Sequence, residues 1–210
     1  MAPPLVAFDF DGTLSDDEMI VELATEAGVR EEVAAITERA MAGELSYGMS
    51  LRKRVAMLEG LELDDADRAF ARIELRPQAR STIDRLRRAG VIVAVITGGF
   101  RRGLEYRFAE DGIVVDSVTA NELVVREGAL TGDVRGPLIE GAKDRALTKT
   151  ARRFGCKTSD AVAVGDGAND IPMLTLAGLA IGFNPTSVVA EVCDHEVDSL
   201  EAILELLDIS

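Results

Sequence analysis

The sequence has few of the residues that build disulfides, histidine-based catalytic sites or membrane spans. Its two cysteines, Cys156 and Cys193, lie far apart and form no C-x-x-C pair, which favours free thiols in a reducing compartment. The single histidine, His195, belongs to no triad or metal-binding pattern, so we expect an ordinary surface or core residue. No apolar run reaches transmembrane length, and the N-terminus lacks a basic segment followed by an apolar one. We therefore expect a soluble, cytoplasmic protein that does not bind membranes.

Positive charge is scarce as well. Asp and Glu number 37 against 23 Lys and Arg, which gives a formal net charge of −14. Such an excess of acid argues against nucleic acids and anionic membranes as partners. Lysine occurs only at positions 53, 143, 149 and 157, a composition that fits a salt-rich cytoplasm and a GC-rich genome equally well. A phosphate site in this chain would need positive charge placed locally.

Strand-like and helical patterns alternate along most of the chain, which is long enough for one domain or one domain with an insertion. This alternation predicts an α/β fold, a Rossmann-like and mainly parallel sheet flanked by helices. Glu127-Gly128, between two short apolar runs, predicts a hairpin. The expected strands are the run that ends at Asp9, then Val91–Ile96, Leu123–Arg126, Ala129–Thr131, Ala161–Val164 and Leu179–Ile181. The expected helices of this part are Pro77–Ala89, Arg102–Glu110, Glu140–Phe154, Ala168–Ala177 and Leu200–Leu207.

The segment between the first two strands is far longer than the dozen or so residues that a simple crossover needs. Residues 16–75 carry four apolar stripes at helical spacing, separated by glycines. We therefore expect a core domain of residues 1–15 and 76–210, with residues 16–75 inserted as a four-helix-bundle cap. Attached beside the end of the first strand, this cap could act as a lid.

Two carboxylates, Asp9 and Asp11, end the first strand. Residues two apart on a strand point to one face, so these acids project together while Phe8 and Phe10 point away. The pair repels itself unless a cation binds or one member keeps its proton. An EF-hand loop is excluded because Leu14 stands where that loop needs glycine. The plainer alternative is a polar transition from strand to loop.

Thr97-Gly98-Gly99 follows the second predicted strand. A hydroxyl and two glycines allow the backbone to approach an anion and offer N–H donors at a helix start. The alternative is an ordinary turn between strand and helix.

Another polar cluster follows the strand Ala161–Val164. It brings Asp166, Asn169 and Asp170 within five residues, a density of oxygen ligands that suits a hard cation. The alternative is a turn rich in Asp and Asn that also begins a helix.

Two basic residues lie on apolar helix faces. At about 100° per residue, Arg54 lies at the edge of the apolar stripe of its helix, whereas Arg52 and Lys53 point away. Lys143 falls among apolar residues in the first turn of its helix, where the helix dipole disfavours a cation. Each of the two needs an anionic partner, which is either a ligand or a structural salt bridge.

Taken in order along the whole chain, these motifs resemble the four motifs of the phosphoserine phosphatases in the haloacid dehalogenase superfamily. The resemblance includes the cap segments Met41-x-Gly43 and Ser50-Leu-Arg-Lys-Arg54-Val. Thr97 departs from the pattern, since many relatives have Ser there, but it keeps the hydroxyl. We expect no regulatory domain of the kind that precedes the catalytic domain in some relatives.

The resemblance implies hydrolysis of a phosphomonoester, most specifically phosphoserine, in L-serine biosynthesis. Asp9 is then the nucleophile that forms an aspartyl-phosphate, and Asp11 is the general acid and base. Mg²⁺ binds Asp9, Asp166 and the backbone carbonyl of Asp11, while Asp170 orients metal-bound waters.

The resemblance also implies the residues that bind the substrate. Thr97, Gly98, Gly99 and Lys143 would hold the phosphoryl oxygens. The remaining contacts are Asn169 to phosphate or substrate, Arg54 to the serine carboxylate and Glu18 to its ammonium.

For Glu18, the residues alone favour a different reading, because Ser15-x-x-Glu18 before an apolar run is typical of a capping box. Three other functions stay open: action on, or transfer from, another small phosphomonoester, a catalytically silent Mg²⁺- or phosphate-binding module, and a calcium-binding structural protein. The protein is expected to act as a monomer or homodimer.

Overall fold

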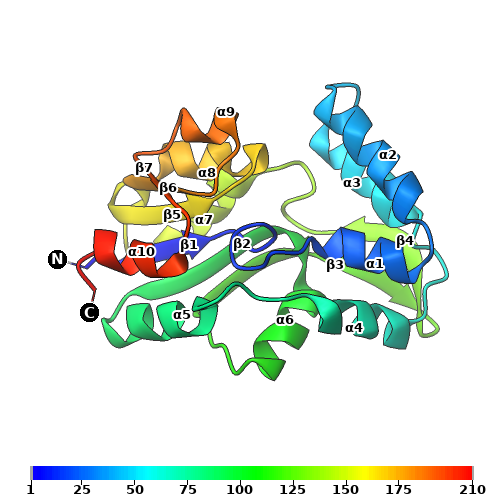
Figure 1. The fold of residues 1–210 in the computed structure, drawn as a ribbon, viewed down its shortest axis with the longest axis horizontal. Helices are drawn as coiled ribbons and strands as arrows, with labels where there is room; N and C mark the ends of the chain where they lie inside the picture. Colours follow the sequence, from blue (N-terminus) through cyan, green and yellow to red (C-terminus); the bar gives the residue numbers. More distant parts are fainter. Residues whose placement is uncertain (1, 210) are drawn as a thin grey trace.

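The computed structural model describes residues 2–209, which form one seven-stranded sheet with helices on both faces (Figure 1). The strands follow the order β4-β3-β2-β1-β5-β6-β7 across the sheet. Neighbouring strands are parallel except β3 and β4, which form an antiparallel hairpin at one edge. The strands are β1 (Leu5–Phe8), β2 (Ile92–Phe100), β3 (Ser117–Arg126), β4 (Ala129–Arg135), β5 (Ala161–Gly165), β6 (Leu179–Phe183) and β7 (His195–Val197). The predicted fold class is confirmed.

Side chains of β1 alternate between two cores, one on each face of the sheet. Val6 and Phe8 belong to the larger core, and Leu5 and Ala7 to the smaller one. Asp9 continues the alternation of Leu5 and Ala7, so its carboxylate emerges on the face of the smaller core. The larger core packs against α5 (Ala79–Arg88), α6 (Arg101–Glu110) and α10 (Leu200–Leu206), and the smaller one against α7 (Lys143–Arg153) and α8 (Ile171–Leu176).

Strands β2 and β3 are both longer than their sequences indicate. β2 continues through Thr97-Gly98-Gly99 to Phe100, which pairs with Asn121 of β3 after an irregularity in the register. Glycine is depleted in strands, so this segment reads as a turn in the sequence although its backbone remains extended. The first half of β3, Ser117 to Asn121, alternates polar and apolar residues, but the alternation is short and its apolar members, Val118 and Ala120, are small. The predicted hairpin is confirmed, with Glu127 and Gly128 both at positive φ.

Residues 16–75 form four helices between β1 and α5. Contacts join α1 to α4 and α2 to α3, while α4 also packs on α6 and α3 on β4. The α2–α3 pair rises beyond the sheet, on the right in Figure 1. No helix within residues 2–209 has the length and apolar content to cross a bilayer. The four helices are α1 (Met19–Glu26), α2 (Arg30–Met41), α3 (Tyr47–Ala56) and α4 (Leu63–Arg72), and a short α9 (Ser187–Ala190) follows β6.

Backbone hydrogen bonds close the base of this inserted segment and tie the turn between α3 and α4 to the sheet. Where the segment leaves and rejoins the core, the N–H of Arg76 donates to the carbonyl of Leu14 at 2.9 Å. Far from there, the N–H of Leu130 in β4 donates to the carbonyl of Leu61 at 2.8 Å, and the N–H of Gly60 donates to the carbonyl of Leu130 at 2.9 Å. The hairpin therefore anchors the end of the insertion that lies farthest from β1.

Candidate active site

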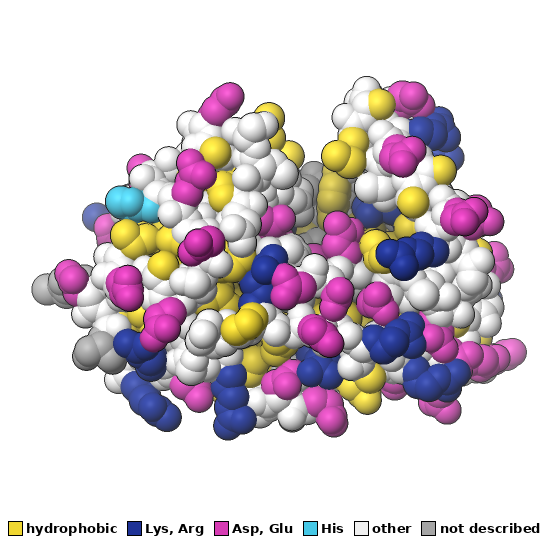
Figure 2. All heavy atoms as spheres, viewed as in Figure 1, with side chains coloured by type: hydrophobic (Ala, Val, Ile, Leu, Met, Phe, Trp, Pro, Cys, Tyr) yellow, Lys and Arg dark blue, Asp and Glu magenta, His cyan; other side chains and the backbone are white. Residues whose placement is uncertain are grey.

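A cleft of about 450 Å³ opens at the carboxyl ends of β1, β2 and β5, beneath α2 and α3. Figure 2 shows the hollow between this helix pair and the loops that follow β5 and β6. Open α/β sheets bind their ligands at this edge. All predicted site residues line the cleft except Lys143 and Asp170, which are buried beneath Asp9. The predicted residues that line the cleft are Asp9, Asp11, Glu18, Arg54, Thr97, Gly98, Gly99, Asp166 and Asn169.

Lys143 is the first residue of α7, and its ammonium lies between two carboxylates. Its Nζ is 2.7 Å from Asp9 Oδ1 and forms a second ion pair with Asp170. Burial by itself lowers the pKa of Lys143, but the carboxylates of Asp170 and Asp9 raise it above its ordinary value. The ammonium therefore stays charged. The salt bridge considered as an alternative explanation of this lysine exists, and its partners are themselves predicted site residues.

Asp9 is almost completely buried at the end of β1. Burial raises the pKa of its carboxyl well above the usual value and the Asp170 carboxylate raises it further, although Lys143 opposes both. Within residues 2–209, its Oδ1 accepts no hydrogen bond of ordinary geometry and has only the nearby Lys143 ammonium. Additional positive charge at this point would favour the ionised carboxylate.

Three acids could hold a metal ion. Asp9, Asp166 and Asp170 each place one carboxylate oxygen within 4.8 Å of the others. Burial, followed by the charge of Asp170, raises the pKa of Asp166 to about 6. Asp170 uses one oxygen in its ion pair and the other to accept the N–H groups of Asp166 and Gly167, both at 3.1 Å. Clustered carboxylates are donors for hard cations, so the residues present fit a divalent ion such as Mg²⁺.

Asp11 is not part of this cluster, because its carboxyl points toward the start of α1. Its Oδ1 accepts the N–H of Met19 at 3.1 Å. Burial raises the pKa of Asp11 to about 7, even though this hydrogen bond lowers it. Such a carboxyl can hold or release a proton near neutral pH, as a general acid and base must. A metal contact through the Asp11 backbone carbonyl stays a prediction.

The segment Thr97-Gly98-Gly99 forms a wall of the cleft as the end of β2. The N–H of Gly99 donates to Thr97 Oγ1 at 3.0 Å. A Cβ on Gly98 would lie 1.9 Å from the hydroxyl of Tyr47, and one on Gly99 would lie 2.8 Å from Asp11 Oδ2. A side chain at either position would therefore force Tyr47 or Asp11 to move.

Arg54 on α3 is buried and faces the cleft. Within residues 2–209 it forms no salt bridge, and its Nε has no hydrogen-bond partner. The structural salt bridge considered for Arg54 is therefore absent from this part of the chain. Arg52 points away from the cleft, as the helical spacing predicts. It pairs with Glu140 at 3.4 Å on the exposed side. The guanidinium of Arg54 is available for an anion in the cleft.

The capping box predicted from Ser15 and Glu18 is wrong. Glu18 is itself the N-cap residue of α1 and makes no side-chain cap bond, while the Ser15 hydroxyl donates to the carbonyl of Asp17 at 2.7 Å. The exposed Glu18 side chain lines the cleft. His195 is exposed, as expected of a surface residue.

Tyr47 and Thr13 contact predicted site residues and were not predicted from the sequence. The Tyr47 hydroxyl approaches Gly98 from the cap side, and burial raises the pKa of this tyrosine to about 12. Thr13 donates from its hydroxyl to Asp166 Oδ1 at 2.8 Å. Tyr47 shares a helix face with Arg54, which could have suggested its position. No pattern in the sequence links Thr13 to Asp166.

The family model of the haloacid dehalogenase-like hydrolases matches residues 6–175, a range that contains all the predicted site residues. The chain belongs to the haloacid dehalogenase-like hydrolases. The phosphoserine phosphatase of Halobacterium salinarum is 50% identical over 204 residues, which cover 97% of each chain. That of Methanocaldococcus jannaschii is 44% identical over 191 residues, 90% of each chain. The predicted family is confirmed.

A solved structure described as a phospho-aspartyl intermediate analogue of phosphoserine phosphatase superimposes with a TM-score of 0.90. It is 41% identical, and the match covers 99% of this chain and 100% of the relative. A second, described as a substrate-bound phosphoserine phosphatase complex, has the same TM-score and identity and covers 99% of both chains. The likeness therefore extends over the cap helices as well as the sheet.

Proposed function

We propose that this protein is a Mg²⁺-dependent phosphomonoester hydrolase that converts O-phospho-L-serine and water into L-serine and phosphate. The observation that carries the proposal is the arrangement of charge across one cleft. Asp9 and Lys143 lie at its floor, and Arg54 lies on its cap side, buried and without an acidic partner within residues 2–209. A phosphate at the floor and a carboxylate at Arg54 match this arrangement. The names of the relatives at 50% and 41% identity support the same substrate.

Asp9 is the nucleophile in this proposal. One of its carboxylate oxygens attacks phosphorus, the bond from phosphorus to the seryl oxygen breaks, and an aspartyl-phosphate forms. Asp11 gives its proton to the departing seryl oxygen and then takes a proton from the water that attacks phosphorus. The bond between phosphorus and the Asp9 oxygen breaks in this second step, which releases phosphate and restores the carboxylate. The raised pKa of Asp11, about 7, suits both roles. Such proton transfer typically contributes about 10²- to 10⁴-fold.

The transferring phosphoryl group is held by Lys143, the Thr97 hydroxyl and the N–H of Gly98. These groups are fixed in advance by β2 and α7 and lie where water is largely excluded, so their charge and dipoles act at full strength. The N–H of Gly99, which was predicted to bind phosphate as well, donates to Thr97 Oγ1 in this structure and so orients that hydroxyl. Asn169 contacts the phosphate or the substrate from the loop after β5.

The amino-acid part of the substrate faces the cap. Arg54 binds the carboxylate, for which a planar guanidinium offers two parallel donors. Glu18 pairs with the ammonium at the other side of the cleft.

Asp9 and Asp166 would hold Mg²⁺ together with the backbone carbonyl of Asp11. The ion supplies positive charge that offsets the repulsion between an anionic nucleophile and an anionic ester. Both oxygens of Asp170 are engaged by Lys143 and by backbone N–H groups, so this carboxylate would act on metal-bound waters and not as a direct ligand. The raised pKa values of Asp9 and Asp166 support the need for such an ion.

The domain division is part of the proposal. Residues 1–15 and 76–210 form the catalytic core, and residues 16–75 are the cap that contributes Glu18 and Arg54. The location of the protein is proposed to be the cytoplasm, where free thiols such as Cys156 and Cys193 persist.

A substrate panel tests this function. Phosphate release is measured from phosphoserine, phosphothreonine, phosphoethanolamine and p-nitrophenyl phosphate, with Mg²⁺ and again after chelation with EDTA. We expect the highest kcat/KM for phosphoserine, and loss of turnover on chelation that added Mg²⁺ restores. A preference for an ester without a carboxylate would reject the substrate, and turnover that survives chelation would reject the metal.

A further inference from the structure

Asn121 is a fully buried polar residue that contacts the wall of the cleft from behind. It lies on β3 and has no exposed surface. Its side-chain Nδ2 donates to the carbonyl of Gly98 at 2.9 Å, and its Oδ1 accepts the N–H of Leu138 at 3.0 Å. Asn121 does not line the cleft, so it touches no ligand there.

Gly136 leaves the space that the Asn121 side chain occupies. Gly136 has a φ of +145° and lies against Asn121, so that a Cβ on Gly136 would stand 2.4 Å from Asn121 Oδ1. A residue with a side chain at 136 would displace the amide from both of its partners. Glycine at this position therefore preserves the two hydrogen bonds of Asn121.

The first hydrogen bond fixes a peptide group that faces the cleft. The carbonyl of Gly98 and the N–H of Gly99 belong to one planar trans peptide and point in opposite directions. When Asn121 holds the carbonyl, the N–H of Gly99 must point away from Asn121. It donates to Thr97 Oγ1 at 3.0 Å. Because that oxygen accepts this proton, the hydroxyl directs its own proton elsewhere, and Thr97 lines the cleft.

The second hydrogen bond reaches the segment that enters α7. Leu138 is completely buried and stands five residues before Lys143, the first residue of that helix. A single amide thus connects the segment that carries Thr97 with the segment that leads to the site lysine. Linked hydrogen bonds of this kind strengthen one another in a buried environment.

We propose that Asn121 is the positioning residue of the anion-binding end of the cleft. It sets the orientation of the Gly98–Gly99 peptide and, through it, the direction in which the Thr97 hydroxyl donates. The choice of phosphate as the anion rests on the function proposed above. Asn121 itself takes no part in the chemistry.

Phosphate affinity of substituted proteins tests this role. Asn121→Asp keeps an acceptor for Leu138 but removes the amide donor to Gly98, whereas Asn184→Asp adds the same charge at an exposed residue that does not line the cleft. Binding of inorganic phosphate is measured by calorimetry with Mg²⁺ present, alongside kcat, KM and the melting temperature. We expect Asn121→Asp to weaken phosphate binding and lower kcat by about 10- to 100-fold, the usual size for a lost orienting partner. Asn184→Asp should match the wild type.

A double-mutant cycle separates positioning from stability. If Asn121 acts through the Thr97 hydroxyl, its substitution should cost much less phosphate affinity when Thr97 is already Val. Additive losses, or a lower melting temperature with unchanged phosphate affinity, would overturn the proposal. Asn121→Ser introduces no buried charge and serves the same cycle if Asn121→Asp does not fold.

The wild type separates this proposal from the proposed function. If the wild type binds phosphate but does not hydrolyse phosphoserine, the proposed substrate is wrong. The phosphate affinities of the Asn121 variants then still test the positioning role. If it binds no phosphate, both proposals fail.

Discussion

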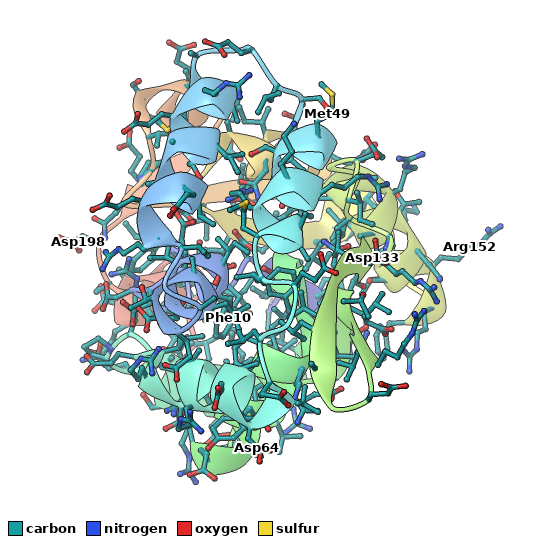
Figure 3. All side chains as sticks on the ribbon, turned by 90° about the vertical axis from the view of Figure 1, so that its right-hand side faces the viewer. Phe10, Met49, Asp64, Asp133, Arg152 and Asp198 are labelled. Carbon is teal, nitrogen blue, oxygen red and sulfur yellow. The ribbon has the colours of Figure 1, made fainter. Side chains whose placement is uncertain are left out.

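The floor and the cap side of the cleft are built in opposite ways. At the floor, Asp9, Lys143 and Asp170 are at most 3% exposed and are held by β1, α7 and the loop after β5. On the cap side, Met41 is 83% exposed and Met49 is 50% exposed. Figure 3 shows Met49 near the outer end of α3, far from Phe10 at the base of the helix pair. Helix α2 buries only Val33 among its twelve residues.

This difference separates two requirements of one reaction. Charges that stabilise a transferring phosphoryl group act best when they are fixed and shielded from water. A surface that admits a substrate and then encloses it must instead be able to move, and sparsely packed elements move at low cost. The chemistry is therefore expected to depend on the floor and the choice of substrate on the cap side.

The largest effect is expected at the floor, from Asp9→Asn. Without a carboxylate nucleophile, turnover of phosphoserine should fall by on the order of 10⁴-fold or more. Asp133→Asn, on the exposed hairpin labelled in Figure 3, is the control and should retain full activity. Activity is measured on protein checked for deamidation. Residual activity of more than a few per cent of the wild type would reject Asp9 as the nucleophile. A fluoride analogue of phosphate should be trapped at Asp9 only when Mg²⁺ is present.

Lys143→Met should lower kcat/KM by about 10³- to 10⁵-fold, the range found for a cation that stabilises a transferring phosphoryl group. It also leaves two buried carboxylates unpaired, so unfolding should become easier by roughly 3–5 kcal/mol. Lys149→Met changes an exposed lysine of the same helix and should alter neither quantity. Equal kinetic losses in both variants would contradict the assignment. A loss confined to the melting temperature would make the lysine purely structural.

On the cap side, Arg54→Ala should raise KM for phosphoserine. A lost charged pair in a closed site is worth roughly 2–5 kcal/mol, on the order of 30- to 5,000-fold. Esters without a carboxylate, such as phosphoethanolamine, should be hydrolysed almost as before. Arg52→Ala removes an arginine that faces outward and should stay within a few fold of the wild type. If Arg54→Ala harms all esters equally, the guanidinium supports the cap and the division of labour fails.

The smallest effect is expected where the two sides touch. A methyl group on Gly98 would stand 1.9 Å from the Tyr47 hydroxyl. Gly98→Ala should therefore raise the free energy of the arrangement in which Tyr47 lies against residue 98 by about 1–3 kcal/mol, with a matching fall in kcat/KM. Removing the phenolic oxygen with Tyr47→Phe in the same protein should recover most of the loss. No recovery would show that the two residues do not meet in the working enzyme.

Sequence reasoning succeeded where local spacing determines geometry. The apolar run of β1 located Asp9 and Asp11 just beyond the end of the strand, and the period of a helix separated Arg54 from Arg52. The strand period did not hold past Asp9, because the Asp11 carboxyl turns toward the start of α1 instead of projecting with Asp9. Sequence reasoning failed where the decisive contact joins distant segments, as for Asn121, Tyr47 and Thr13. Asparagine within a strand is a weak signal, because its low strand propensity hints at a special partner without naming it.

Errors in the predicted elements have local causes. Because glycine is rare in strands, Gly98 and Gly99 suggested that β2 ends before them. The capping box failed because Ser15 turns its hydroxyl to the carbonyl of Asp17 instead of the first turn of α1. A short polar pattern fits several hydrogen-bonding arrangements, and packing of the surrounding chain selects among them.

The backbone hydrogen bonds between the inserted segment and β4 limit how the cap can move. Mechanically, the segment resembles a beam clamped at both ends, at Leu14 and Arg76 beside β1 and at Leu61 and Leu130 beside the hairpin. A rigid swing of residues 16–75 would break the two bonds to Leu130, whereas a displacement of α2 alone breaks neither of them. The compliant part of this beam is its unsupported middle, α2 and the turns that flank it, directly above the cleft.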